Sequence, residues 1–130
     1  MINFAEILKA EPTGVLATLD GDKVKTRVFQ YLFADGNKAY FCTNSEKPVY
    51  AQLVKNPNVS FCSMNKYNPV LSINGKAVFT ESLELKKKAL DENPMIQTIY
   101  HSPDNPVFKI FYIDIEEMQT FSFDQGPKTY

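Results

Sequence analysis

The first half of the chain is built mainly from short runs in which hydrophobic and polar residues alternate with a period of two. Such alternation is typical of β-strands, and stretches with helical spacing separate the runs. The pairs Asp20-Gly21 and Asp35-Gly36 interrupt the alternation and favour hairpin turns. In order, the pattern predicts a helix over 2–10, strands over 15–19, 23–34 and 38–43, and a helix over 47–55 that ends at Asn56-Pro57.

The long strand over 23–34 changes its hydrophobic phase partway along. Val24 and Val28 occupy even positions, whereas Phe29, Tyr31 and Phe33 occupy odd positions. Because successive side chains of a strand point to opposite faces, this switch predicts a bend or bulge near residues 28–29. Strands that close a barrel need such bends.

The second half continues with strands, helices and an irregular region. Residues 70–80 alternate like a strand, but Asn74-Gly75 lies in the middle, and local rules favour a hairpin turn there over a bulge in one strand. Around this segment the pattern predicts strands over 59–64, 107–115 and 118–123, a charged helix over 82–92 that starts near Ser82, and a short helix over 95–100.

Six or seven strands joined by hairpins, with a few short helices, indicate a mostly β fold. We expect a mostly antiparallel β-barrel with peripheral short helices. The chain has 130 residues and shows no linker, repeat or low-complexity segment. We therefore expect one domain over residues 1–130.

Composition and charge exclude several function classes. The net charge is −1, so we expect no nucleic-acid partner. No hydrophobic run is long enough to span a bilayer and the N-terminus lacks the pattern of a signal peptide, which predicts a cytoplasmic protein without a membrane partner. One histidine, His101, and two cysteines offer no recognisable metal site, and Cys42 and Cys62 are expected to be buried free thiols.

The segment from Phe41 to Pro48 is the most informative for chemistry. A strand ends there, small polar residues follow, and a helix begins. The first amides of a helix lack partners and carry partial positive charge, so hydroxyls of Thr43 and Ser45 and the ammonium of Lys47 could complete an anion site, most naturally for a phosphate. Pro48 suits the first helical turn. The alternative is plain N-capping by Thr43 or Ser45, with Lys47 solvated.

Arg27 is the second candidate for anion binding. It is the only arginine of the chain and lies in a predicted strand beside Val28 and Phe29. Its side chain either projects toward a polar ligand or pairs with a surface carboxylate. Glycine-rich nucleotide loops, zinc-protease helices and nucleophile elbows are absent from the sequence.

The sequence resembles the pyridoxamine 5'-phosphate oxidase-like family of FMN-binding split barrels. The resemblance rests on the order and spacing of Gly14-Val15-Leu16-Ala17-Thr18, Arg27-Val28-Phe29, Tyr40 to Gln52, Asn56-Pro57-Asn58-Val59 and Gly75-Lys76-Ala77. The latter part, with Asn93-Pro94-Met95 and Tyr100 to Asn105, is similar to a compact branch near the nitroimidazole-resistance flavoproteins.

The resemblance implies a six-stranded antiparallel split β-barrel, a homodimer, and FMN in grooves between the subunits. It also implies that 70–80 is one strand with a bulge. By this resemblance Arg27 and Lys47 contact the FMN phosphate with support from Thr43 and Ser45, and the backbone of Val28, Phe29 and Gln30 meets the isoalloxazine ring. Asn44 and Gln52 are candidates for the ribityl chain or the pocket wall, next to Pro48 at the helix start.

Departures from the family pattern shape the expected activity. Leu32 and Glu46 stand where full oxidases have lysine and arginine, and no arginine follows Arg27. We therefore expect a reductase-like oxidoreductase acting on a small molecule, with nitro compounds as candidates, rather than an oxidase of pyridoxamine phosphate. Two alternatives stay open: an electron carrier without its own substrate, and a barrel that binds haem, with His101 as axial ligand, or a deazaflavin.

Overall fold

The computed structural model describes residues 2–64 and 70–130 of the chain. Its helices are α1 (Phe4–Ala10), α2 (Pro48–Lys55), α3 (Leu83–Glu92) and α4 (Pro94–Tyr100). Its strands are β1 (Thr13–Asp20), β2 (Lys23–Gln30), β3 (Phe33–Asp35), β4 (Lys38–Asn44), β5 (Asn58–Ser63), β6 (Val70–Thr80), β7 (Phe108–Ser122) and β8 (Gly126–Thr129). All four predicted helices are confirmed within two residues at either end.

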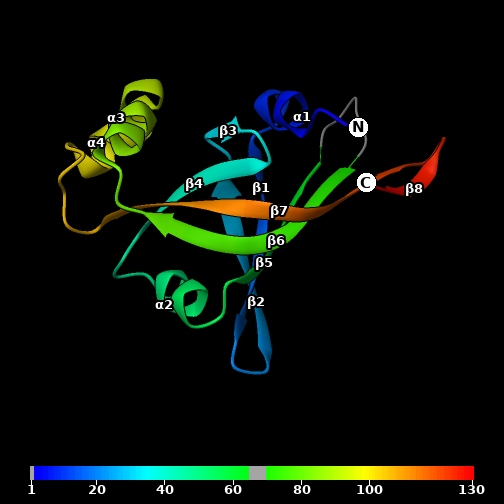
Figure 1. Cartoon of the computed structure of the whole chain (residues 1–130), viewed down its shortest axis with the longest axis horizontal. Helices are drawn as coiled ribbons and strands as arrows, with labels where there is room; N and C mark the ends of the chain where they lie inside the picture. Colours follow the sequence, from blue (N-terminus) through cyan, green and yellow to red (C-terminus); the bar gives the residue numbers. More distant parts are fainter. Residues whose placement is uncertain (1, 65–69) are drawn as a thin grey trace.

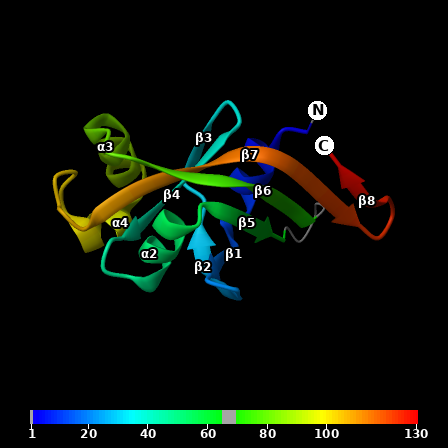
Figure 2. The same cartoon turned by 60° about the horizontal axis from the view of Figure 1, so that its bottom comes forward.

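The strands form one antiparallel sheet in the order β2-β1-β5-β6-β7-β4-β3, and β8 pairs with the end of β7. The predicted mostly β, antiparallel split barrel is confirmed. The six expected strands are present among the described residues, together with two short ones, β3 and β8. The helices α3 and α4 cover one end of the long sheet, and β8 lies at the other (Figure 1 and Figure 2).

The barrel closes where the chain passes from β2 to β3. These two strands are neighbours in the sequence, yet they lie at opposite ends of the sheet order. The Tyr31 amide donates to the carbonyl of Pro12, at 2.7 Å, and the Leu32 amide donates to the carbonyl of Tyr40, at 2.9 Å. The predicted strand over 23–34 is therefore interrupted, and its bend lies at Tyr31-Leu32 rather than near 28–29. Val24 and Val28 are exposed on the outer face of β2, whereas Phe29 packs against the core from the inner face. The apparent phase switch therefore reflects apolar residues on both faces of the strand and not a bend at 28–29.

The strand β6 runs unbroken through Asn74 and Gly75. The hairpin that local rules favoured there is wrong, and the bulge that the resemblance implied is confirmed by a register shift between these two residues. Asn74 pairs with Glu117 and Gly75 with Ile115, so Glu116 is the extra residue. The tight contact explains the glycine, since a Cβ at position 75 would lie 2.0 Å from the Asp114 carbonyl oxygen.

The same bulge corrects the reading of the C-terminal strands. Residues 107–115 and 118–123 were expected to form two strands, but β7 is one strand of 15 residues. Buried positions change from Phe111 and Ile113 to Met118 and Thr120, because the extra residue at the bulge reverses the alternation. A reversal of phase looks like a strand break in the sequence, although the hydrogen-bonded ladder continues.

The core contains a cluster of phenylalanines inside the barrel. Phe41, Phe61 and Phe111 are fully buried, and the Phe41 ring centroid lies 4.8 Å from that of Phe61 and 5.5 Å from that of Phe111. A second cluster, which includes Phe108, fixes α3 and α4 against β4 and β7. Among the described residues no helix is long and apolar enough to cross a bilayer.

We expect the Gly75→Ala variant to lose about 1–3 kcal/mol of unfolding free energy, because the added methyl group has to push the β6 backbone away from β7. Thermal and urea unfolding would measure this loss. Lys76→Ala, an exposed position of the same strand, is the matched control and should change stability by about 0.5 kcal/mol. Equal stability of the two variants would contradict the tight contact at the bulge.

Candidate functional site

A hollow of about 430 Å³ lies between β2, β4, α2 and α4. Its size is in the range of small-molecule sites. It brings together six of the sequence-predicted site residues, namely Arg27, Val28, Phe29, Gln30, Thr43 and Lys47. The remaining wall is formed by Cys42, Val49, Ile96, Ile99 and Tyr100. One part of the lining is therefore cationic and the rest is largely apolar.

Thr43 is the most unusual polar residue of this hollow. It lies at an inward position of β4, and only 2% of its surface is exposed. Its Oγ1 atom has no hydrogen-bond partner among the described residues. A buried hydroxyl without a partner costs free energy, so such a group marks a place where a ligand would complete the hydrogen bonding.

The start of α2 adds positive charge beside Thr43. Lys47 is the N-cap residue and Pro48 the first helical residue, and no side chain caps the helix. The alternative of N-capping by Thr43 or Ser45 is therefore wrong. The Lys47 ammonium and the positive end of the helix dipole lie together, as an anion site requires.

Asn44 ends β4 and Ser45 begins the loop before α2, and neither lines the hollow. The Asn44 side-chain carbonyl accepts a hydrogen bond from the Glu46 amide at 2.8 Å, and the Ser45 amide donates to the Val107 carbonyl at 2.9 Å. Both residues thus shape the loop that brings Lys47 to the hollow. Their direct contact with a cofactor stays a prediction.

Arg27 is held by neutral oxygens rather than by a carboxylate. Its Nη1 donates to Thr18 Oγ1 and its Nη2 to Gln52 Oε1, each at 2.7 Å. No carboxylate in the described part of the chain lies within 4.0 Å of it, so the alternative of a surface ion pair is not what the structure shows. Partial burial lowers the pKa of Arg27 from its ordinary value, which is too high for the group to lose its charge near neutral pH.

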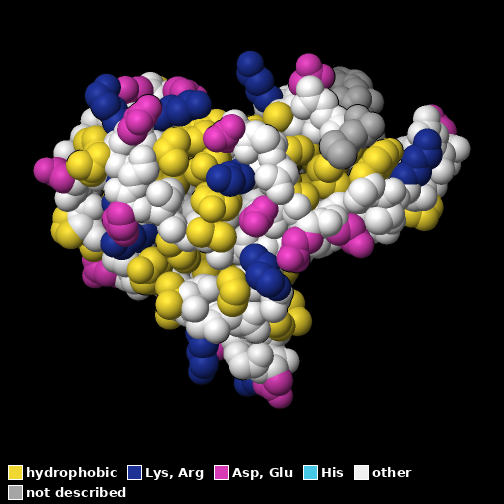
Figure 3. All heavy atoms as spheres, viewed as in Figure 1, with side chains coloured by type: hydrophobic (Ala, Val, Ile, Leu, Met, Phe, Trp, Pro, Cys, Tyr) yellow, Lys and Arg dark blue, Asp and Glu magenta, His cyan; other side chains and the backbone are white. Residues whose placement is uncertain are grey.

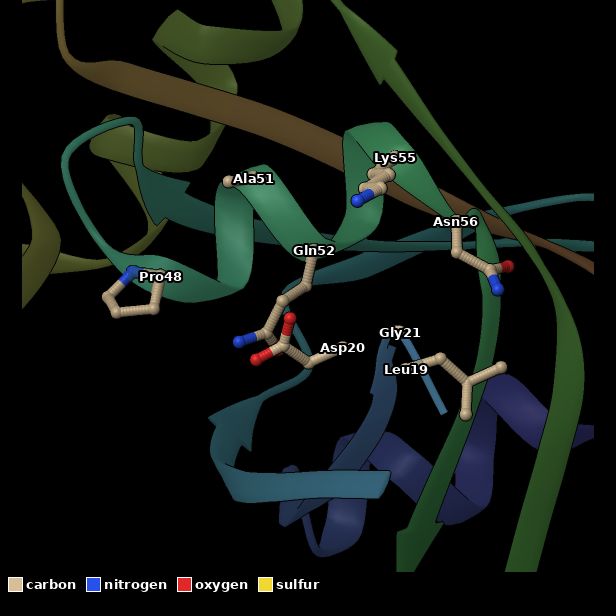
Figure 4. A pocket seen from close by; sticks show the side chains of 8 residues that line it. All are labelled: Leu19, Asp20, Gly21, Pro48, Ala51, Gln52, Lys55 and Asn56. Carbon is tan, nitrogen blue, oxygen red and sulfur yellow. The ribbon is translucent and has the colours of Figure 1, made fainter. Parts of the chain in front are cut away.

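Gln52 and Pro48 line a second hollow, of about 370 Å³, between α2 and the tip of the β1–β2 hairpin. Figure 4 shows Gln52 and Lys55 on the helix, with Asp20 and Gly21 of the hairpin below them. Gln52 lies next to both hollows, because its side chain also reaches Arg27. A direct contact between Gln52 and a cofactor stays a prediction.

Two further groups of the cationic hollow are neutral. Burial raises the pKa of Cys42 to about 12, and burial together with the nearby Cys42 raises the pKa of Tyr100 to about 12. A thiol and a phenol with such pKa values stay protonated near pH 7, so Arg27 and Lys47 alone supply charge to the wall. The phenol can still donate a hydrogen bond.

Six residues of this region were not among the site residues predicted from the sequence. Ile96, Ile99 and Tyr100 share the hollow-facing side of α4, and helical spacing alone gives no sign that α4 packs over β2 and β4. Val49 and Thr18 were noted only as parts of family motifs, and Cys42 only as a buried thiol. The expectation that Cys62 is also buried is wrong, since its side chain is exposed. His101 is exposed and does not line the hollow, and no metal-binding cluster occurs in the described ranges.

Comparison with solved structures shows the same fold in several proteins. A NimC/NimA family protein from Clostridium acetobutylicum is 28% identical, with a TM-score of 0.87 over 98% of this chain and 91% of that chain. A search of curated protein sequences finds no match.

More distant structures share the fold alone. One is a pyridoxamine 5'-phosphate oxidase-related, FMN-binding protein from Nostoc punctiforme (13% identity, TM-score 0.62, 92% of this chain and 85% of that chain). Another is a heme binding protein from Mycobacterium smegmatis (16% identity, TM-score 0.77, 100% of this chain and 58% of that chain).

The family model for pyridoxamine 5'-phosphate oxidase matches residues 2–122, which is nearly the whole chain. This match agrees with the split-barrel sheet. The chain belongs to the pyridoxamine 5'-phosphate oxidase family.

Proposed function

We propose that this protein binds FMN and works as a homodimeric oxidoreductase that reduces a small molecule in the cytoplasm. The observation that carries the proposal is the buried Thr43 hydroxyl, which has no partner among the described residues and lies in one hollow with Lys47 and Arg27. Two cations, a free hydroxyl and a helix start match the oxygens and charge of a phosphate. The phosphate of FMN is the part of the cofactor that needs such groups.

The open edge of β2 supports the proposal that the isoalloxazine ring binds beside this strand. In the described part of the sheet β2 pairs only with β1, so its other edge presents backbone amides and carbonyls. Val28, Phe29 and Gln30 form this edge beside the hollow. A flavin ring has donors and acceptors along one side, which a strand edge can match, and apolar faces that suit Val49 and Ile96.

We propose that a second copy of the chain packs on the outer face of β2, β1 and β5. Across these strands Val28 pairs with Val15 and Val15 with Cys62, and the neighbouring row is Thr26, Ala17 and Ser60. None of these side chains is charged, and Val28 and Val15 are 67% and 43% exposed. In Figure 3 hydrophobic side chains lie near the base of the projecting β1–β2 hairpin, and charged side chains lie at its tip. Large exposed apolar patches mark interaction sites.

Val28 belongs both to this face and to the hollow. A second copy that covers the face would therefore border the hollow, and the cofactor groove would be shared between subunits. This continuity explains how a chain of 130 residues could enclose so large a cofactor.

When bound, FMN would supply the redox chemistry of the reaction. The residues of this chain bind and orient: Lys47 and Arg27 neutralise the phosphate, and α4 excludes water from one side of the hollow. The neutral Tyr100 hydroxyl offers a hydrogen-bond donor at the wall. The resemblance to nitroimidazole-resistance flavoproteins supports nitro compounds as substrates.

We expect Lys47→Ala to weaken FMN binding about tenfold or more and to leave riboflavin binding nearly unchanged, because riboflavin lacks the phosphate. Quenching of flavin fluorescence on titration with protein would measure both dissociation constants. Lys55→Ala is the matched control, since Lys55 is on the same helix but lines the other hollow. Protein that stays colourless with saturating FMN would overturn the proposal. A strong absorbance spectrum of bound haem or deazaflavin would then favour the alternative that the barrel binds that cofactor.

We expect the FMN-loaded protein to oxidise NADH or NADPH in the presence of a nitroaromatic acceptor. The rate would be followed by the loss of nicotinamide absorbance, with free FMN at the same concentration as the background. Reduction of the bound flavin without turnover of any small acceptor would favour the electron-carrier alternative.

We expect Val15→Glu to convert a dimer to a monomer, because the glutamate puts a charge at the centre of the uncharged face. Sedimentation velocity would show the change in mass. Val54→Glu, at a valine that is 60% exposed on α2, should leave the mass unchanged. A monomeric wild-type protein would contradict the proposed dimer.

A further inference from the structure

Thr18 is a buried polar residue that connects β1, β2 and α2. Only 2% of its surface is exposed. Its Oγ1 donates a hydrogen bond to Gln52 Oε1 at 2.6 Å and accepts one from Arg27 Nη1 at 2.7 Å. Gln52 Oε1 also accepts from Arg27 Nη2 at 2.7 Å. The three side chains form a closed triangle of hydrogen bonds.

This triangle occupies one edge of the guanidinium. The two acceptor oxygens face Nη1 and Nη2, the edge at the tip of the side chain, and the carbonyls of Leu16 and Lys25 approach Nη1 at 3.3 Å. The Nε atom has no partner in the residues that the structure describes. An arginine has five N–H donors in a rigid plane, so the side edge, made of Nε and the second N–H of Nη2, is left to face a ligand.

The chemistry of the acceptors is as informative as their position. A purely structural arginine is commonly paired with a carboxylate, which cancels its charge. Thr18 and Gln52 are neutral, so they orient the guanidinium and leave its positive charge uncompensated. The hydrogen bonds to Thr18 and Gln52 also orient the long side chain before a ligand binds, which lowers the entropy lost on binding.

We infer that Thr18 and Gln52 form a neutral acceptor pair that positions Arg27, so that its Nε–Nη2 edge is presented to the cofactor phosphate. Thr18 is then a positioning residue, and Gln52 acts through Arg27. This inference rests on the proposed function, because it assigns the phosphate of FMN as the ligand of the free edge.

The test compares two flavins in three variants. Thr18→Val removes the hydroxyl at nearly constant volume, and Thr18→Ser retains it. Gln52→Glu keeps the hydrogen bonds and places a negative charge against the guanidinium. Dissociation constants for FMN and riboflavin would be measured by flavin fluorescence, together with the melting temperature of each variant without flavin.

Thr18→Val and Gln52→Glu should each raise the dissociation constant for FMN about tenfold, while that for riboflavin changes by less than about twofold. Thr18→Ser should restore the wild-type preference for FMN. A merely structural role would weaken both flavins equally. If Thr18→Val fails to fold, the ratio of the two constants in Gln52→Glu decides the question.

Two negative outcomes are distinct. Wild-type protein that binds neither flavin, or binds both equally, overturns the proposed phosphate site and this inference with it. Wild-type protein that prefers FMN, with the same preference in the Gln52→Glu variant, overturns the inference alone.

Discussion

Closure of the barrel at Tyr31-Leu32 is the constraint on which the site depends. Two residues carry the chain from the edge of β1 to the edge of β4, and one backbone hydrogen bond on each side fixes the crossing. Before the crossing β2 has only one neighbour, so its outer edge stays open at Val28 to Gln30. After it, β4 presents Thr43 on the other side of the same hollow. Without this crossing the arginine of β2 and the threonine of β4 would not line one hollow.

The positive end of the hollow combines two different ways of fixing a cation. Arg27 is partly buried and its orientation is set by the side chains of β1 and α2. Lys47 is exposed at a helix start, where only the backbone of the loop determines its place. The guanidinium of Arg27 is therefore oriented by hydrogen bonds, whereas the exposed Lys47 contributes a charge at the helix start. Such a pair suits an anion, because little entropy is lost in orienting the arginine and the lysine side chain can adjust its position to the anion.

Local sequence predicted the helices and most strands, because hydrophobic period and turn residues act over a few positions. It failed at Asn74-Gly75, where the pair has the chemistry of a hairpin turn but the neighbouring strand β7 forces an extended backbone. It also divided β7 at the bulge, because a reversed phase and a strand end have the same local signature. The family resemblance corrected the first error, since homologous sequences carry long-range information that one segment lacks.

The candidate site shows the same division between local and long-range information. Lys47 and Pro48 were recognisable from the helix start, and Arg27 from its being the only arginine. The role of Thr18 depends on a contact across 34 positions with Gln52, and that of Ile99 on how α4 folds back over the sheet. Neither contact leaves a mark in the neighbouring sequence, because the residue types involved are ordinary for a strand and a helix.

The position of β7 in the sheet has a consequence for synthesis of the protein. Residues 108–114 supply the second neighbour of β4, and residues 110–121 supply that of β6. Chains emerge from the ribosome at about 5–20 residues per second, N-terminus first. Until β7 has emerged, the only neighbour available to β4 among the described strands is the three-residue β3. The wall that carries Thr43 is therefore completed only after residues 108–114 have been synthesised, more than 60 positions after Thr43 itself.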